Sequence, residues 1–114
     1  MAKKAFTSSL QIRNSGNFMD RITFKKSGEF IADRNVSDRV LRVVITFEQH
    51  EGRLRVVYCL RGEPTEEDCE DCELTCAELV AEFPEIKMAE TRCIPISEYV
   101  ISDNDIGEVV FSRS

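Results

Sequence analysis

Apolar residues recur every three or four positions between Thr65 and Pro84, and this spacing predicts an amphipathic helix. At about 100° per residue, the apolar side chains share one arc that is expected to face the core: Cys69, Cys72, Cys76, Leu79, Val80 and Phe83. The acids lie largely on the opposite side, and five of them mark the outer face: Glu67, Glu70, Asp71, Glu78 and Glu82. The Thr65 hydroxyl can cap the first turn, and Pro84 ends the helix.

Residues 39–48 and 53–60 alternate apolar and polar side chains, which predicts two strands. Glu51 and Gly52 lie between them and are expected to form a two-residue turn, with Gly52 at positive φ. This turn sets the expected register, in which the opposed pairs are Phe47 and Val56, Ile45 and Tyr58, Val43 and Leu60, Val44 and Cys59, and Glu48 and Arg55. The hairpin should form the centre of a sheet, and its Val43, Ile45 and Phe47 side chains should pack under the Leu79, Val80 and Phe83 side of the helix.

The rest of the chain is expected to add short extended pieces. Residues 6–12 read as a short strand or a helix edge, 19–32 as a small hairpin turning at Lys26-Ser27-Gly28, and 102–105 as a polar turn. Residues 85–96 read as a strand with an irregularity at Glu90 and an edge position near Pro95, and 107–111 as a last short strand. The predicted fold is α+β, with an antiparallel or mixed sheet centred on the long hairpin and one main acidic helix across one face, in a single domain over residues 1–114.

The negative charge is concentrated in the helix. The segment between Arg61 and Lys87 holds ten acids and no base, so it carries −10, and the rest of the chain carries +4, which gives the net −6. Binding to nucleic acid or to an anionic membrane requires clustered Lys and Arg, so a basic protein partner is expected instead. We expect a reducing, cytoplasmic location for three reasons. The sequence has no long apolar run, no secretory h-region near Met1, and an odd number of cysteines, five.

Cys69, Cys72 and Cys76 have two interpretations. Their position inside the apolar arc favours buried, reduced thiols that act as small hydrophobic residues. The alternative is a metal-binding or redox module, in which Cys59, Cys93 or a carboxylate would supply a fourth ligand. We expect no metal and no cofactor.

The chain shows no catalytic signature, so we expect a protein that is not an enzyme. His50 is the only histidine and lies at the predicted hairpin tip, without an evident nucleophile beside it. An EF-hand calcium loop and a glycine-rich phosphate loop are both absent from the sequence.

The acidic face has a structural and a functional interpretation. Acids on a helix surface can simply keep a protein soluble. However, exposed helices usually mix charges, because like charges at i and i+4, such as Glu66 and Glu70, repel each other. The lack of any compensating base favours a docking surface formed by Glu67, Glu70, Asp71, Glu78 and Glu82, with Leu74 as an apolar anchor among them.

The order of these elements resembles that of small bacterial immunity proteins of contact-dependent or polymorphic toxin systems. The similarity covers residues 19–113 and includes the Thr65-x-x-Asp68 helix start, Ala81-Glu82-Phe83-Pro84 and the terminal Val109-Val110-Phe111-Ser112-Arg113. It implies a cytosolic antidote that occludes the active site of a toxin domain, often a nuclease, whose basic surface would suit an acidic face. A cysteine-based module and an adaptor or regulatory subunit unrelated to toxins are the alternatives.

Overall fold

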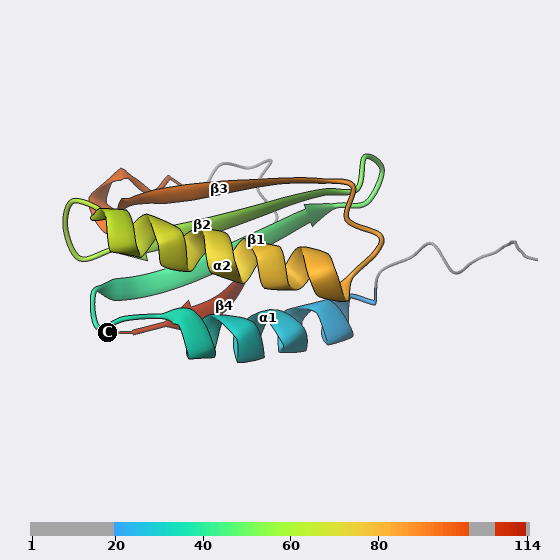
Figure 1. The fold of residues 1–114 in the computed structure, drawn as a ribbon, viewed down its shortest axis with the longest axis horizontal. Helices are drawn as coiled ribbons and strands as arrows, with labels where there is room; N and C mark the ends of the chain where they lie inside the picture. Colours follow the sequence, from blue (N-terminus) through green and yellow to red (C-terminus); the bar gives the residue numbers. More distant parts are fainter. Residues whose placement is uncertain (1–19, 101–106, 114) are drawn as a thin grey trace, which may run out of the picture.

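The computed structural model describes residues 20–100 and 107–113, and its elements form a sheet covered by two helices (Figure 1). The elements are α1 (Arg21–Asn35), β1 (Val40–Glu48), β2 (Arg53–Leu60), α2 (Glu66–Glu82), β3 (Met88–Pro95), the 3-10 turn η1 (Ile96–Glu98) and β4 (Glu108–Ser112). The strand order is β3-β2-β1-β4, with β2 and β3 parallel and the other pairs antiparallel. The predicted α+β class with a mixed sheet is confirmed. The prediction for residues 6–12 and the polar turn at 102–105 lie outside the described residues.

Residues 21–35 form helix α1, so the small hairpin expected over residues 19–32 is wrong. Asp20 caps the helix by accepting a hydrogen bond from the Ile22 N–H, at 3.0 Å. Gly28 does not turn the chain, because it lies inside α1, on the side of the helix that faces the sheet. A Cβ built on Gly28 would lie 2.6 Å from Ile45 Cδ1, so the missing side chain permits the close packing.

The β1–β2 hairpin is present, with a register different from the one expected. The structure pairs Phe47 with Leu54, Ile45 with Val56, Val43 with Tyr58, Val44 with Val57 and Glu48 with Arg53. Four residues, 49–52, therefore connect the strands, because the Glu48 carboxylate accepts the N–H groups of His50 and Glu51 at 3.2 and 2.7 Å and widens the turn. Gly52 has φ +67°, as predicted. Each of these β1 residues therefore pairs with the β2 residue two positions before the expected one. A shift by an even number of residues leaves every side chain on its expected face of the sheet.

The main core lies between the sheet and both helices. Val43 and Ile45 belong to the same buried cluster as Leu79 and Phe83, and Phe47 packs against it, as predicted. Val80 is the exception, since 39% of its surface is exposed. The buried stripe of α2 is rotated toward Asp68 and Thr75, which are both buried, and this rotation carries Val80 out of the core.

The remaining strands differ in detail from the expectations. β3 begins at Met88, and its register with β2 is continuous, so the irregularity expected at Glu90 is absent. Pro95 does lie on an edge strand, and the last strand occurs at Glu108–Ser112, close to its expected place. Within residues 20–100 and 107–113, no helix has the length and apolar content needed to cross a membrane.

Candidate functional site

The N-terminus of α2 is fixed by reciprocal hydrogen bonds. The Asp68 N–H donates to Thr65 Oγ1 at 3.2 Å, and the Thr65 N–H donates to Asp68 Oδ2 at 2.8 Å, which forms a capping box. Arg39 Nε also donates to Asp68 Oδ2, at 3.0 Å. Burial alone would raise the pKa of Asp68, but the hydrogen bonds from Thr65 and Arg39 outweigh it and lower the pKa. Asp68 is therefore a structural acid, and Arg39 is bound to it.

Two of the five predicted docking acids contact α1. Glu78 Oε1 accepts from Arg34 Nη2 at 2.9 Å and from Asn35 Nδ2 at 3.0 Å. These hydrogen bonds lower the pKa of Glu78, with the Asn35 bond as the largest cause. Glu82 Oε2 accepts from the Ser27 hydroxyl at 2.8 Å. Glu78 and Glu82 thus face α1 and help to hold the two helices together.

The other acids of α2 form a surface that we call the acidic crest: Glu66, Glu67, Glu70, Asp71 and Glu73. Asp71 is half-buried and the other four are exposed. Among the residues that the structure describes, no Lys or Arg forms an ion pair with the crest. Partial burial raises the pKa of Asp71, and the charges of Glu67, Asp68 and Glu70 raise it further. The crest is therefore a concentration of negative charge that the described fold does not neutralise.

The crest retains three of the predicted residues and adds two. Glu67, Glu70 and Asp71 were expected to be on the outer face, whereas Glu66 and Glu73 were not singled out as docking residues. Their exposure follows from the helical wheel once the buried stripe is centred on Asp68 and Thr75. Leu74 lies next to the crest and is 47% exposed, which keeps it available as an apolar anchor.

The cysteines lie mainly beneath α2 rather than at an open site. Cys59, Cys72 and Cys76 are buried, Cys69 and Cys93 are half-buried, and all five are free thiols. Burial raises the pKa of Cys72 to about 12, and the pKa of Cys93 is also raised, first by burial and then by its hydrogen bond with Cys69. Protonated thiols are poor nucleophiles and poor metal ligands. In the described part of the chain, no three His, Cys, Asp or Glu side chains come together so as to hold a metal ion.

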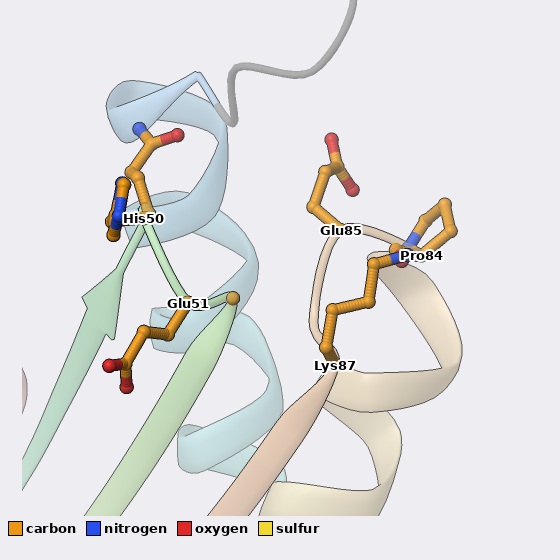
Figure 2. A pocket seen from close by; sticks show the side chains of 7 residues that line it. His50, Glu51, Pro84, Glu85 and Lys87 are labelled. Carbon is orange, nitrogen blue, oxygen red and sulfur yellow. The ribbon is translucent and has the colours of Figure 1, made fainter.

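His50 lines a hollow of about 400 Å³ at one end of the sheet (Figure 2). Figure 2 shows His50 and Glu51 on the β1–β2 turn and Pro84, Glu85 and Lys87 on the α2–β3 loop, across an open gap. Lys87 Nζ donates to the Pro84 carbonyl at 3.2 Å. The residues that line this hollow include no Ser, Thr or Cys that His50 could activate.

Comparison with known proteins identifies the family. A family model described as MafI2 immunity protein matches residues 34–114, a span that includes all four strands and α2. The comparison with curated proteins returned no match. The family match covers well over half of the chain and agrees with the resemblance noted in the order of its elements. The chain therefore belongs to the MafI2 immunity protein family and is an immunity protein of a polymorphic toxin system.

Proposed function

We propose that the chain neutralises its cognate toxin by placing the acidic crest of α2 against a basic surface of the toxin. Membership of the immunity family supplies a toxin as the partner. The observation that carries the proposal is the unneutralised charge of the crest. Arg34 and Arg39 lie close to α2, yet they bind Glu78 and Asp68 and leave Glu67 and Glu70 without an ion-pair partner among the described residues.

A basic surface is the expected feature of a nuclease, because a site that holds a phosphate backbone concentrates Lys and Arg. The crest would accelerate association with such a site and then cover it. Burial and then the neighbouring acids raise the pKa of Asp71 in the free chain, and a cation placed near it would counter this shift. We infer that the toxin domain is a nuclease, that the chain binds it in the cytoplasm as one folded domain, and that the chain itself binds no nucleic acid.

The charge proposal is tested by the rate of association with the cognate toxin domain. The cognate domain is identified as a toxin domain whose toxicity is suppressed when this chain is co-expressed with it. The test variant removes three charges from the crest: Glu67→Gln, Glu70→Gln and Asp71→Asn. The control variant removes three exposed charges elsewhere: Glu29→Gln, Asp33→Asn and Glu98→Gln.

At low salt, the crest variant should associate about tenfold more slowly than the wild type, and the control should change little. The salt dependence should weaken in the crest variant only, because screening acts over a Debye length of about 8 Å at physiological ionic strength. Equal rates and equal salt slopes for both variants would show that the crest serves solubility alone.

The nuclease assignment has its own readout. The isolated toxin domain should cleave RNA or DNA, and the chain should stop cleavage when the two proteins are present at equal concentrations. Stoichiometric inhibition is expected from occlusion, whereas inhibition by trace amounts of the chain would indicate that it modifies the toxin enzymatically. A toxin domain without nuclease activity would contradict the assignment and leave the charge test intact.

A further inference from the structure

Strand β3 forms one edge of the sheet. It pairs with β2 in parallel, and no described strand lies on its other side (Figure 1). The pairing is continuous over all eight residues, from Met88 with Arg53 to Pro95 with Leu60. Its first half is open to solvent, since Met88, Ala89 and Glu90 are exposed. Such an edge presents a row of backbone groups to which another strand can be added.

The backbone groups that face outward can be identified from the register. The Met88 N–H donates to the Gly52 carbonyl at 3.1 Å, so the backbone of Met88 points toward β2. Consecutive residues of a strand direct their N–H and C=O groups to opposite sides. Glu90 and Arg92 therefore bond to β2 as Met88 does. The N–H and C=O groups of Ala89, Thr91 and Cys93 point away from β2, toward the open edge.

The opposite edge of the sheet is less suited to strand addition. β4 has five residues, and its pairing with β1 is interrupted by a register shift opposite Val43 and Val44. Bulges and short edge strands are features that protect natural sheets from further pairing. By contrast, β3 contains no register shift, and its only proline is its last residue, Pro95.

The open edge of β3 runs beside the acidic helix. The Cys72 thiol of α2 donates to the Arg92 carbonyl of β3 at 3.6 Å, and Cys69 lies close to Cys93, which identifies the flank of α2 that faces this strand. Helical spacing places Glu73 and Val80 on the same flank as Cys69. Glu73 is exposed, and Val80 is 39% exposed. Cys93 packs against the core under the helices, and strand alternation places the small side chains of Ala89 and Thr91 on the same face. A segment paired with β3 would therefore lie beside Glu73 and Val80.

We propose that the toxin contributes an extended segment that pairs with β3 as a fifth strand of the sheet. Its backbone bonds to Ala89, Thr91 and Cys93, and its basic side chains extend toward Glu73 and the rest of the acidic crest. The proposal rests on the proposed function, since it assigns a binding mode to the same partner. It also explains how a helix surface and a sheet edge act together: the edge supplies backbone bonds, and the crest selects a basic segment.

Proline substitution tests this mode at a single N–H group. Thr91→Pro removes an outward N–H and spares the bonds to β2, and proline is tolerated on edge strands in this position. The matched control is Ser112→Pro on β4. The Arg113 N–H donates to the Leu41 carbonyl at 2.8 Å, so the N–H of Ser112 points away from β1, toward the other edge.

Thr91→Pro should weaken toxin binding at least about tenfold, through one lost hydrogen bond and the steric block of the ring, whereas Ser112→Pro should bind as the wild type does. Wild-type affinity for a folded Thr91→Pro variant would overturn the strand proposal. If the crest variant still associates slowly in that case, the charge proposal stands alone. The reverse pattern, with affinity lost in Thr91→Pro and normal kinetics in the crest variant, would support the edge and overturn the charge proposal.

Amide hydrogen exchange supplies a second measurement that needs no substitution and decides the matter if Thr91→Pro fails to fold. In the free chain, the amides of Ala89 and Thr91 should exchange faster than those of Glu90 and Arg92, which bond to β2. In the complex with the toxin domain, Ala89 and Thr91 should become protected while Ser112 stays unchanged. Unchanged exchange at Ala89 and Thr91 in the complex would overturn the proposal.

Discussion

Arg34 and Glu78 join the two helices, with 2.9 Å between Arg34 Nη2 and Glu78 Oε1. The same oxygen also accepts from Asn35 Nδ2 at 3.0 Å, so two residues of α1 hold this carboxylate. Glu70, two turns earlier on α2, has no ion-pair partner among the described residues. Acids of one helix that look equivalent in the sequence therefore have different tasks, one in holding the fold together and one at the surface.

Glu78→Gln should lower the free energy of unfolding by up to about 1 kcal/mol, a modest loss because Arg34 is half-exposed and the bond is partly screened by solvent. Its association with the toxin should keep the wild-type rate. Glu70→Gln should leave stability equal or slightly higher, because it relieves repulsion with Glu66 and Glu73, and it should slow association. Urea unfolding and stopped-flow binding measure the two effects. If Glu78→Gln has normal stability but associates slowly with the toxin, Glu78 belongs to the docking surface after all.

Tyr58 and Thr75 share a hydrogen bond between their hydroxyls inside the core, where both side chains are fully buried. Tyr58→Phe should cost about 1 to 3 kcal/mol, since it leaves the Thr75 hydroxyl without this partner, and Thr75→Val should cost a similar amount. The double variant should cost less than the sum, because it removes both polar groups. Strict additivity in urea unfolding would mean that the two hydroxyls do not act as a pair.

The sequence was sufficient to predict the elements with a strong single period. The alternation in β1 and β2 and the 3.6-residue period of α2 identify them directly. Helix α1 was missed because Ile22 and Phe24 alternate like strand residues and Gly28 resembles a turn. The residues of α1 that face the core are Phe24, Gly28, Ile31 and Ala32. Glycine is needed among them because a side chain at position 28 would clash with Ile45 of the sheet, a contact that the sequence does not reveal.

The concentration of negative charge on α2 was predictable from the sequence, but which of its acids are paired within the fold was not. The excess of acids over bases in 62–86 is a property of the sequence alone. Which acids remain free depends on α1, because Arg34 and Ser27 bind Glu78 and Glu82 across the interface between the helices. The hairpin register depended in the same way on the Glu48 side chain, whose bonds to the turn replaced the tighter connection expected from Glu51 and Gly52.

The thiols should separate into two classes when the native protein is alkylated. Cys69 and Cys93 are half-buried and should react first, with Cys69 ahead because the pKa of Cys93 is raised by burial and by the bond with Cys69. Cys59, Cys72 and Cys76 should react only after denaturant is added. Mass spectrometry of the labelled peptides measures the order. Early labelling of Cys72, or stoichiometric zinc in protein purified without chelators, would contradict this assignment.

Asp68 should contribute stability that depends on pH. Its pKa is lower in the folded state, so the contribution is fully present above the unfolded value of about 3.9 and is lost as the pH falls through the folded value. Asp68→Ala should therefore cost about 1 to 2 kcal/mol at pH 7 and progressively less in acid. Thr65→Ala, which removes the other half of the capping box, serves as the control. A cost that stays constant between pH 7 and pH 2 would show that the charge of Asp68 is unimportant.

The ionised carboxylate of Asp71 should reduce stability, which is opposite to the effect of Asp68. Burial and the neighbouring acids raise its pKa in the folded chain, so its ionised form opposes folding, and this penalty develops as the pH rises from the unfolded toward the folded value. Asp71→Asn should stabilise the chain by a few tenths of a kcal/mol at pH 7 and have no stabilising effect below pH 3, where the carboxyl is protonated in both states. Urea unfolding at the two pH values measures the difference.

Binding of the toxin should shift the pKa of Asp71 in the opposite direction. A basic surface placed over the crest favours the ionised form of Asp71, so binding should lower its pKa and release protons near the pH at which Asp71 titrates in the free chain. Calorimetry of binding in two buffers with different ionisation enthalpies counts those protons, and Asp71→Asn should reduce the count. Proton uptake on binding would show that the partner brings acids or apolar groups to the crest, and that the basic surface is absent.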